Sequence, residues 1–541
     1  MSKKKIMYIF NDTEFGGAGQ SLVDTLVEIK KEVSPVVIIR SDAMVENKFK
    51  DLGVAYYKID FSTDYIESYK INEENRQADI KKSYEAALEL VPIIEKEKIQ
   101  LIHINSSVSS FAAIAALIAK VPYVWHIREL LKEQYGCDFI NEKLKLYLYN
   151  RASKLITISE YVKCCYQEKY NLDTLKMYNG LDLERFKVHL DKKRNFSNIF
   201  LAVGMITPEK GQWDAICATE YLIENGYSNI KLIIVGSGGS IYIWAIKKYI
   251  EKKELNNNIF ILPFHNDLSE LRNKASYAIT CSQNEALGRV TLEAMLAGNI
   301  VIGAKSGGTT EIIGENEERG FLYELHNSKS LADTMIRAIK CSDETKRIIL
   351  ERAQLYSENN FNTKSYCKNL VKVYDDVIFS YEIKNEEDFL CNLKNYCMSI
   401  KESIAYIENE NYIQCAKAKT ANGILLKWLR IKQKGRSIYE YFRQHNIRNI
   451  AIYGMADIGC CLYDELENSN IEIKYLIDKD PKGIQSIIRN FVSLDEKISI
   501  DAIVVTVAFT EGQVVNELRQ KGYSCVIGLS EILDELSNQI Y

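Results

Sequence analysis

The chain has 541 residues, of which 47% are hydrophobic and 26% are charged, and its net charge at pH 7 is −4. This length is too great for one hydrophobic core, so several domains are expected, and the slightly acidic balance argues against a nucleic-acid-binding protein. No apolar run reaches the ~18 residues of a membrane-spanning helix, and the N-terminal apolar stretch is too short for a secretory signal, so we expect a cytoplasmic protein.

Short β-branched runs alternate with helical stretches through roughly the first 380 residues, which predicts parallel sheets covered by helices. The runs predicted as strands are residues 5–10, 101–104, 123–126, 154–158, 199–203, 231–235 and 300–302. The turn-forming pair Asn179-Gly180 divides this region into two blocks, residues 1–180 and 181–380. The second block ends in residues 362–379, whose apolar residues have helical spacing. This last helix is expected to cross back to the first block.

The remaining part of the chain differs in character. Residues 381–440 are charged and have helical spacing, which fits either a helical spacer or a dimerising helical hairpin. A third, smaller α/β unit is expected over residues 441–541, with strands near 448–453, 473–477, 502–506 and 524–528.

The most informative stretch is EALGRVTLEAMLAG, from Glu285 to Gly298. It follows a predicted strand, and Gly288 lets the backbone come close to a ligand. A helix is predicted to start at Arg289 or Val290 and to stop at Gly298. A loop that leads from a parallel strand into a helix N-terminus is a ready anion site, because the first N–H groups of the helix have no partner within it.

Two glutamates eight residues apart frame this anion site. Glu293 is expected in the first turn of the helix, where its carboxylate can accept hydrogen bonds from a ribose diol, and Glu285 can likewise accept them from sugar hydroxyls. The alternative is a surface helix that is acidic near its start for electrostatic reasons. The order of the glycines and the later segment 307–311, GGTTE, weaken that alternative. Together these residues resemble the E-x7-E signature of retaining glycosyltransferases with the GT-B fold, of the family-4 type.

The resemblance covers roughly residues 5–380 and implies an α/β protein with the GT-B fold, in which two Rossmann-like domains face a cleft. Residues 1–180 would form the acceptor-side domain and residues 181–380 the donor-binding domain. The chain adds the helical spacer at 381–440 and a small Rossmann-like module at 441–541.

The resemblance also implies the roles of individual residues. Lys210, in the loop VGMITPEKG, would contact the donor diphosphate, where a positive charge meets the growing negative charge of the leaving group. His126 would contact the transferred sugar, and its alternative is a structural histidine at a strand end. The glycine loop after the first strand, alternatively a simple turn, would approach the donor phosphate. The donor-binding set is Gly16, Gly17, Gly204, Lys210, Leu287, Gly288, Arg289, Val290 and Glu293, and the catalytic set is His126, Lys210 and Glu285.

One position departs from the family pattern. Met205 stands where an arginine usually completes a basic pair with the lysine, and Arg289 is the nearest candidate to supply the second charge. No metal is expected, since Lys210, Arg289 and the helix N–H groups would meet the charge on the diphosphate. The 13 cysteines show no C-x-x-C spacing, so we expect free thiols and no zinc site.

The C-terminal unit has a glycine loop of its own. Gly454 and Gly459 lie between a predicted strand and a predicted helix, and Asp478 ends the next strand, where a ribose-binding acid would stand. Ala456 replaces the middle glycine of the dinucleotide fingerprint. The module therefore either holds a nucleotide site or is an inert or protein-binding unit, and we favour the second alternative.

The sequence thus predicts a retaining, metal-independent hexosyltransferase without a cofactor. Its donor is expected to be a nucleotide-diphosphate sugar, with UDP-sugar as the first choice, and its acceptor a glycan or lipid-linked glycan of cell-surface polysaccharide synthesis. The alternatives are a catalytically weak GT-B subunit that binds a glycan or protein partner, and a GT-B epimerase or phosphorylase. Oligomerisation would use residues 381–440.

Peripheral contact with the inner membrane face is a further expectation. Residues 141–151 mix lysines with Leu and Tyr, which is typical of a basic helix on an anionic membrane. A core-packing helix with its lysines in water is the favoured alternative.

Overall fold

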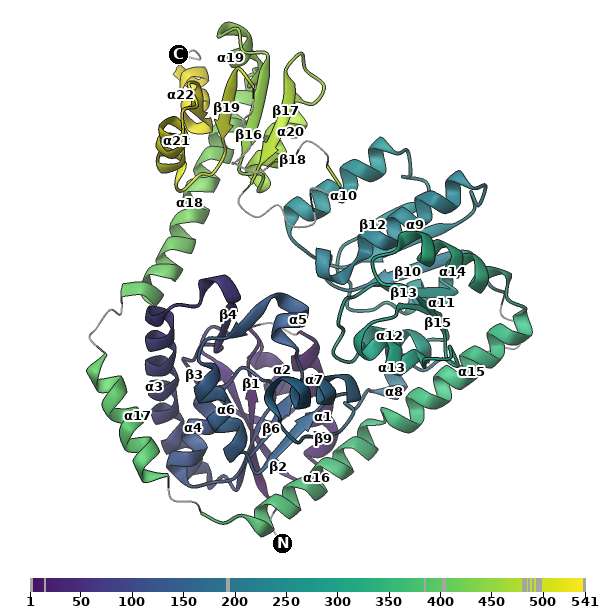
Figure 1. Cartoon of the computed structure of the whole chain (residues 1–541), viewed down its shortest axis with the longest axis vertical. Coiled ribbons are helices and arrows are strands. Elements are labelled where there is room, and N and C mark those ends of the chain that lie inside the picture. The colour runs from purple at the N-terminus through teal and green to yellow at the C-terminus, as the bar shows by residue number, and fades with distance from the viewer. Residues whose placement is uncertain are drawn as a thin grey trace. The chain divides into compact units, whose positions relative to one another are not determined.

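A computed structural model of the chain describes residues 3–538, except residues 14–15, 191–194, 384–385, 401–404, 479–483, 485–486, 489–490 and 493–498, and it leaves the side chains of 405–415 undescribed. The described residues divide into two compact units. Figure 1 labels their helices and strands. The first consists of Met1–Gly204, Glu209–Val235 and Phe264–Lys401, and the second of Met205–Pro208, Gly236–Pro263 and Glu402–Tyr541. None of the helices in the described part of the chain is both long and apolar enough to cross a bilayer.

The first unit begins with a parallel sheet in the order β3-β2-β1-β5-β6-β8-β9. Its strands are β1 (Lys5–Phe10), β2 (Ser34–Arg40), β3 (Ala55–Ile59), β5 (Leu101–Ile104), β6 (Tyr123–Ile127), β8 (Lys154–Thr157) and β9 (Leu175–Lys176). The connecting helices are α1 (Gly17–Ile29), α2 (Glu46–Asp51), α3 (Glu73–Glu97), α4 (Ser110–Ala119), α5 (Leu131–Tyr135), α6 (Glu142–Arg151) and α7 (Glu160–Tyr170). Most residues of these strands are buried, because helices cover both faces of the sheet. A short antiparallel pair, β4 (Tyr65–Glu67) and β7 (Cys137–Phe139), lies outside the sheet.

The same unit contains a second parallel sheet, in which strands follow the order β11-β10-β13-β14-β15. These strands are β10 (Ile199–Val203), β11 (Lys231–Val235), β13 (Tyr277–Thr280), β14 (Ile300–Ala304) and β15 (Phe321–Tyr323). The helices are α8 (Leu183–Phe186), α9 (Gln212–Glu224), α11 (Ser269–Lys274), α12 (Arg289–Leu296), α13 (Gly307–Ile313), α14 (Ser328–Lys340), α15 (Asp343–Asn360), α16 (Thr363–Ser380) and α17 (Glu387–Ser399).

In both sheets, the order in which the chain adds strands reverses beside the first strand. Chain order reverses between β1 and β5 in the first sheet, and between β10 and β13 in the second. The loops that leave the carboxyl ends of two such strands diverge, and ligands of open parallel sheets bind in the space between them. The glycine loop at 16–17 follows β1, Lys210 follows β10 and Glu285 follows β13. The sheet topology therefore collects the predicted donor-binding loops at two switch points.

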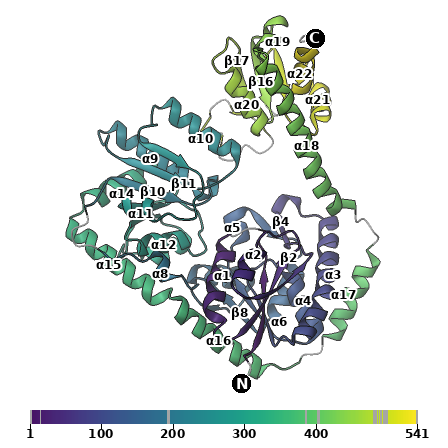
Figure 2. The ribbon, with the colours of Figure 1, turned by 180° about the vertical axis from the view of Figure 1, so that it is seen from behind.

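Helix α16 brings the chain back from the second sheet to the first (Figure 2). It carries Tyr366, Leu370 and Tyr374 into the core cluster that also holds residues of β1, β2 and α1. Just before it, Leu181 N–H donates to the Phe361 carbonyl at 2.7 Å, and a Cβ on Gly180 would stand 2.7 Å from the Thr363 Cα. The chain thus passes between the sheets twice at one place, and Gly180 permits that close approach.

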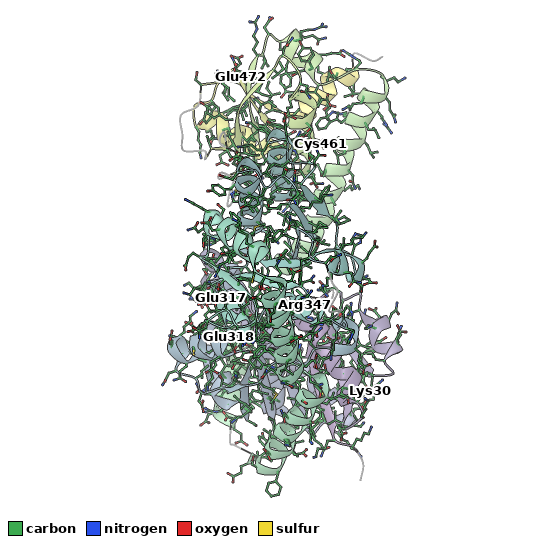
Figure 3. The ribbon with its side chains drawn as sticks, turned by 90° about the vertical axis from the view of Figure 1, so that its right-hand side faces the viewer. Lys30, Glu317, Glu318, Arg347, Cys461 and Glu472 are labelled. Carbon is green, nitrogen blue, oxygen red and sulfur yellow. The ribbon has the colours of Figure 1, made fainter. Side chains whose placement is uncertain are left out.

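The turn after α13 is fixed by one carboxylate. Glu317, labelled in Figure 3, accepts a hydrogen bond from the Leu322 N–H at 2.8 Å and pairs with Arg337 of α14. These contacts hold the entry to β15 and, with it, the edge of the second sheet.

The second unit contains a parallel sheet in the order β18-β17-β16-β19-β20. Its elements are β16 (Asn449–Tyr453), β17 (Glu472–Ile477), β18 (Phe491–Val492), β19 (Ala502–Val505), β20 (Val526–Gly528), α18 (Ala405–Gln433), α19 (Tyr439–Gln444), α20 (Asp457–Leu466), α21 (Glu511–Gln520) and α22 (Leu529–Asn538), together with α10 (Ser240–Lys252) and β12 (Ile259–Leu262).

The expected α/β class with parallel Rossmann-like sheets is confirmed, and the strands predicted at 5–10, 101–104, 199–203 and 231–235 have the predicted bounds. One prediction about side chains is wrong. Lys145 of α6 does not lie in water: its side chain is 1% exposed, its Nζ is 2.6 Å from Asp64 Oδ2, and it stacks on the Trp125 ring. The cost of burying this charge is offset by the ion pair and by a hydrogen bond to the Ser107 carbonyl.

Candidate functional site

The predicted anion site is built at the start of α12. Gly288 caps the helix with φ +96°, a conformation that favours glycine, and the helix runs from Arg289 to Leu296 before Gly298 turns the chain with φ +72°. The predicted start and stop of this helix are confirmed. Glu293, however, is not in the first turn as predicted: it is the fifth residue of the helix, one turn above Arg289. The first N–H groups of α12 therefore carry no acidic side chain beside them within the helix.

Lys210 and Glu285 meet across the switch point of the second sheet. The Lys210 Nζ lies 2.9 Å from Glu285 Oε2, although the two residues are 75 positions apart in sequence. Gly211 makes this approach possible, because it has φ +66° and an added Cβ would be 2.5 Å from the Cys281 carbonyl oxygen. The side chains are 24% and 19% exposed, so an incoming anionic group can compete for the lysine. Lys210, which is predicted to bind the diphosphate, thus lies beside Glu285, which is predicted to accept hydrogen bonds from the sugar.

The downstream glycine pair supports the same loop. Gly308 N–H donates to the Glu285 carbonyl at 2.7 Å, and a Cβ on Gly308 would lie 2.8 Å from the Leu287 Cα. Gly307 has φ +55°, and its Cβ would lie 2.5 Å from the Glu285 carbonyl oxygen. The start of α13 can therefore lie directly against the loop 285–287 only when both positions are glycine. This is the physical reason why the GGTTE segment accompanies the two glutamates.

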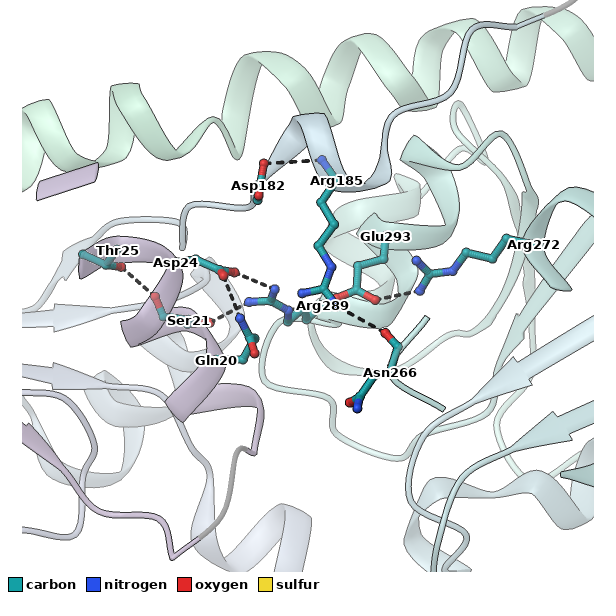
Figure 4. A network of polar contacts seen from close by, with 10 residues as sticks. All are labelled: Gln20, Ser21, Asp24, Thr25, Asp182, Arg185, Asn266, Arg272, Arg289 and Glu293. Carbon is teal, nitrogen blue, oxygen red and sulfur yellow. Dashed lines mark hydrogen bonds and ion pairs between the residues drawn. The ribbon is translucent and has the colours of Figure 1, made fainter. Parts of the chain in front are cut away.

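Arg289 reaches beyond its own helix (Figure 4). Its Nε donates to Glu293 Oε1 at 2.9 Å, and its terminal nitrogens lie 2.7 Å from Asp24 Oδ2 and 3.3 Å from Ser21 Oγ, both in α1. Burial opposes the charge, but the Asp24 and Glu293 carboxylates outweigh it and raise the pKa of Arg289. In this structure the guanidinium is thus paired with two carboxylates. Its predicted contact with the donor diphosphate stays a prediction.

Further polar contacts link α13 and the loop 285–287 to helix α7 of the first sheet. The Glu311 carboxylate of the GGTTE segment accepts hydrogen bonds from the Glu160 and Tyr161 N–H groups at the start of α7. Ser159, the N-cap of α7, donates to the Ala286 carbonyl at 2.5 Å. A carboxylate at a helix N-terminus is electrostatically favourable. The loop that carries Glu285 is therefore held from both sheets.

The glycine loop of the first sheet precedes α1 as predicted. Gly16 is the N-cap of α1, and Gly17 is its first residue, with open space around its Cα. Asp12 lies beside this loop and accepts from the Gly19 N–H at 3.2 Å. Burial and then the nearby Glu129 carboxylate raise the pKa of Asp12 to about 6. Gly204, at the end of β10, has φ +146° and likewise has no atom within 4 Å of an added Cβ.

His126, the predicted sugar contact, is wholly buried in β6. Strand alternation in β6 puts it on the same face as Val124, in the layer under α1 and α16, where its ring lies 6.4 Å from that of Tyr366. Its Nδ1 is 3.3 Å from an Arg128 nitrogen, and its Nε2 has no hydrogen-bond partner among the described residues. Burial, followed by the charge of Arg128, lowers the pKa of His126 well below its usual value. Its role toward the sugar stays a prediction.

The glycine loop of the C-terminal module is closely packed. Gly454 has φ +93°, and a Cβ on Gly459 would lie 2.2 Å from the Gly454 carbonyl oxygen. The Asp478 carboxylate accepts from the Met455 N–H at 2.8 Å. Asp478 thus lies at the loop as predicted, with one oxygen engaged by the backbone. A nucleotide at this loop stays a prediction.

Several residues of the site had no signal in the sequence. Asp24 contacts Arg289, and Arg272 contacts Glu293, each from another helix. A charged residue on a helix is ordinarily a solvated one, so only their tertiary contacts distinguish them. In the described ranges, no group of three or more His, Cys, Asp or Glu side chains is arranged to hold a metal ion.

Comparison with known proteins gives matches over the first two thirds of the chain. The model described as Glycosyltransferase Family 4 matches residues 15–185, and the model described as Glycosyl transferases group 1 matches residues 184–355. An Escherichia coli relative, UDP-Gal:alpha-D-GlcNAc-diphosphoundecaprenol alpha-1,3-galactosyltransferase, is 24% identical over 59% of this chain and 86% of its own. An uncharacterized glycosyltransferase of Methanocaldococcus jannaschii is 25% identical over 66% and 93%.

Solved structures share the fold. Anabaena HepE in complex with UDP and glucose superposes with a TM-score of 0.57 at 22% identity, over 69% of this chain and 99% of its own. Sucrose-phosphate synthase from Thermosynechococcus elongatus superposes with a TM-score of 0.56 at 15% identity, over 70% and 100%.

Proposed function

The chain is a glycosyltransferase with the GT-B fold, and we propose that it transfers a sugar with retention, and without a metal, from a UDP-sugar to a glycan or lipid-linked acceptor. The observation that carries the proposal is the meeting of Lys210 and Glu285, 2.9 Å apart, next to the glycine-capped start of α12. A cation, a carboxylate and free helix N–H groups at one place suit a sugar diphosphate.

The donor is held in three parts. The diphosphate binds Lys210 and the N–H groups at Gly288, Arg289 and Val290, since a helix start attracts anions. Glu293 accepts hydrogen bonds from the ribose diol, and Glu285 accepts them from the sugar. Two relatives support UDP as the nucleotide: HepE binds UDP, and the Escherichia coli enzyme uses UDP-Gal.

The reaction needs stabilisation of the leaving group more than a nucleophilic side chain. As the bond between sugar and diphosphate breaks, negative charge grows on the diphosphate, and Lys210 and the α12 N–H groups meet it. The acceptor hydroxyl attacks from the face that the diphosphate leaves, and a phosphate oxygen takes its proton. Binding donor and acceptor in one geometry supplies much of the remaining acceleration.

The acceptor is proposed from the relatives. The Escherichia coli enzyme acts on a diphosphoundecaprenol-linked sugar, and a Staphylococcus aureus relative is a capsular polysaccharide biosynthesis glycosyltransferase. A lipid-linked or polymeric glycan of the cell surface is therefore the first acceptor class to examine.

The test is release of nucleoside diphosphate from a panel of donors, UDP-Glc, UDP-Gal, UDP-GlcNAc and GDP-Man, with and without EDTA. We expect turnover with a UDP-sugar that EDTA does not reduce, a product with the anomeric configuration of the donor by NMR, and loss of turnover in Lys210→Ala. Lys274→Ala is the matched control, because Lys274 lies in an exposed ion pair on α11. Failure of every donor to turn over or bind would refute the proposal.

A further inference from the structure

A chain of polar contacts, which we term the Arg289 network, links α1 to α12 (Figure 4). Its members are Gln20, Asp24, Arg289, Glu293 and Arg272. The side chains of the four charged members are 5–18% exposed. The network is therefore unlike a surface salt bridge, which water screens and which contributes little.

Every charge in the Arg289 network is paired. Asp24 accepts from Gln20 at 2.7 Å with one oxygen and from Arg289 with the other. Glu293 accepts from Arg289 with Oε1 and from Arg272 with Oε2, at 2.9 and 2.6 Å. Two carboxylates balance two guanidinium groups. Each oxygen of Glu293 still has a second lone pair, so both arginines orient this carboxylate without using up its capacity for a ribose diol.

The position of Arg289 makes it the joint of the network. It is the first residue of α12, and its contact with Glu293 is an i,i+4 contact along that helix. Its contact with Asp24 spans 265 residues. Helix α1 also begins with the glycine loop at Gly16 and Gly17. One rigid helix thus carries both the loop expected to approach the donor phosphate and the carboxylate that holds Arg289.

We propose that Asp24 is a positioning residue for the donor: through Arg289 it holds the Glu293 carboxylate in the orientation that binds ribose. The inference rests on the proposed function of Glu293 as the ribose ligand. Removing the Asp24 charge leaves Arg289 free to turn fully onto Glu293, so the carboxylate loses the geometry that the diol needs. The helix start itself is unchanged, and diphosphate binding remains.

The test compares two nucleotides by calorimetry, UDP and 2′,3′-dideoxy-UDP, which lacks both ribose hydroxyls. Wild-type protein is expected to bind UDP about 10- to 100-fold more tightly, as charge-assisted hydrogen bonds to a carboxylate predict. Glu293→Gln should bring this ratio close to one. Asp24→Asn should lower this affinity ratio at least about threefold, because it weakens the binding of UDP and has little effect on the binding of the dideoxy nucleotide. If Asp24 served folding alone, its replacement would weaken the binding of both nucleotides equally.

The controls separate the possible failures. Glu28→Gln removes an exposed ion pair on the same helix and should leave the ratio unchanged. In an Arg289→Met background, Asp24→Asn should have no further effect, and Asp24→Glu should retain most of the wild-type ratio even if Asp24→Asn folds poorly. An unchanged ratio in Asp24→Asn overturns the inference alone. Absence of UDP binding by the wild type, or an unchanged ratio in Glu293→Gln, overturns the proposed donor site together with it.

Discussion

Acidification should destabilise the first sheet through its buried histidine His103. The ring lies wholly inside the core, with its Nδ1 2.7 Å from the Tyr374 hydroxyl. Burial, followed by the charge of Arg128, lowers the pKa of His103 from its ordinary 6.5 to about 3. Below pH 6.5, His103 therefore binds a proton in the unfolded chain but not in the folded chain. The contribution of the neutral ring to the stability of the fold is fully present above pH 6.5 and is lost as the pH falls toward 3.

The magnitude follows from this pKa difference. Each pH unit below 6.5 lowers the free energy of unfolding by about 1.4 kcal/mol. His103 should therefore lower it by about 2 kcal/mol at pH 5 and by almost nothing at pH 7.5. Asp79 acts with the opposite sign, because burial raises its pKa to about 7. The wild-type curve alone therefore does not isolate the histidine. In His103→Asn, the amide takes the place of Nδ1 and does not titrate, so the difference between the two proteins isolates one proton.

The assay is urea unfolding followed by the fluorescence of Trp125, which is buried in β6. The three other tryptophans are replaced by phenylalanine, so that the signal reports on the first sheet alone. His103→Asn should lose about 2 kcal/mol less than the wild type between pH 7.5 and pH 5. Replacing the exposed His265 by Asn is the matched control for the loss of a histidine. Parallel pH curves for wild type and His103→Asn would refute the reasoning.

The remaining predictions concern single positions. Lys210→Ala should lower kcat by about 100-fold or more, as loss of a group that stabilises the leaving charge does; a decrease like that of Lys274→Ala would contradict this. Lys145→Ala should lower the free energy of unfolding by about 3–5 kcal/mol in urea melts, because it leaves its aspartate buried and unpaired, and equal stability would show that the pair is not formed. Gly307→Ala should abolish nucleotide binding measured by calorimetry, since its Cβ would be 2.5 Å from the Glu285 carbonyl oxygen. Gly423→Ala, with open space around it in α18, should instead raise the melting temperature slightly, because it removes a helix-weakening glycine.

The sequence by itself determined the fold class and the start of the helix at which the anion site is predicted. Strands at 5–10, 199–203 and 231–235 were predictable because buried parallel strands have nearly continuous apolar sequences. The start of α12 was predictable because a glycine and a helix stop at Gly298 are local signals. Even here the sequence misplaced Glu293 by one turn, since the first helical residue depends on the capping geometry of Gly288.

Only the tertiary structure decided which side chains meet. Lys210 and Glu285 come together because they follow β10 and β13, neighbouring strands between which the strand order of the sheet reverses. Asp24 reaches Arg289 across 265 residues, a contact that no local pattern records. His126 points inward because strand alternation in β6 fixes its direction. Lys145, on helix α6, is buried against the Trp125 ring. Local sequence sets backbone conformation, whereas the partner and the burial of a polar side chain depend on packing between distant segments.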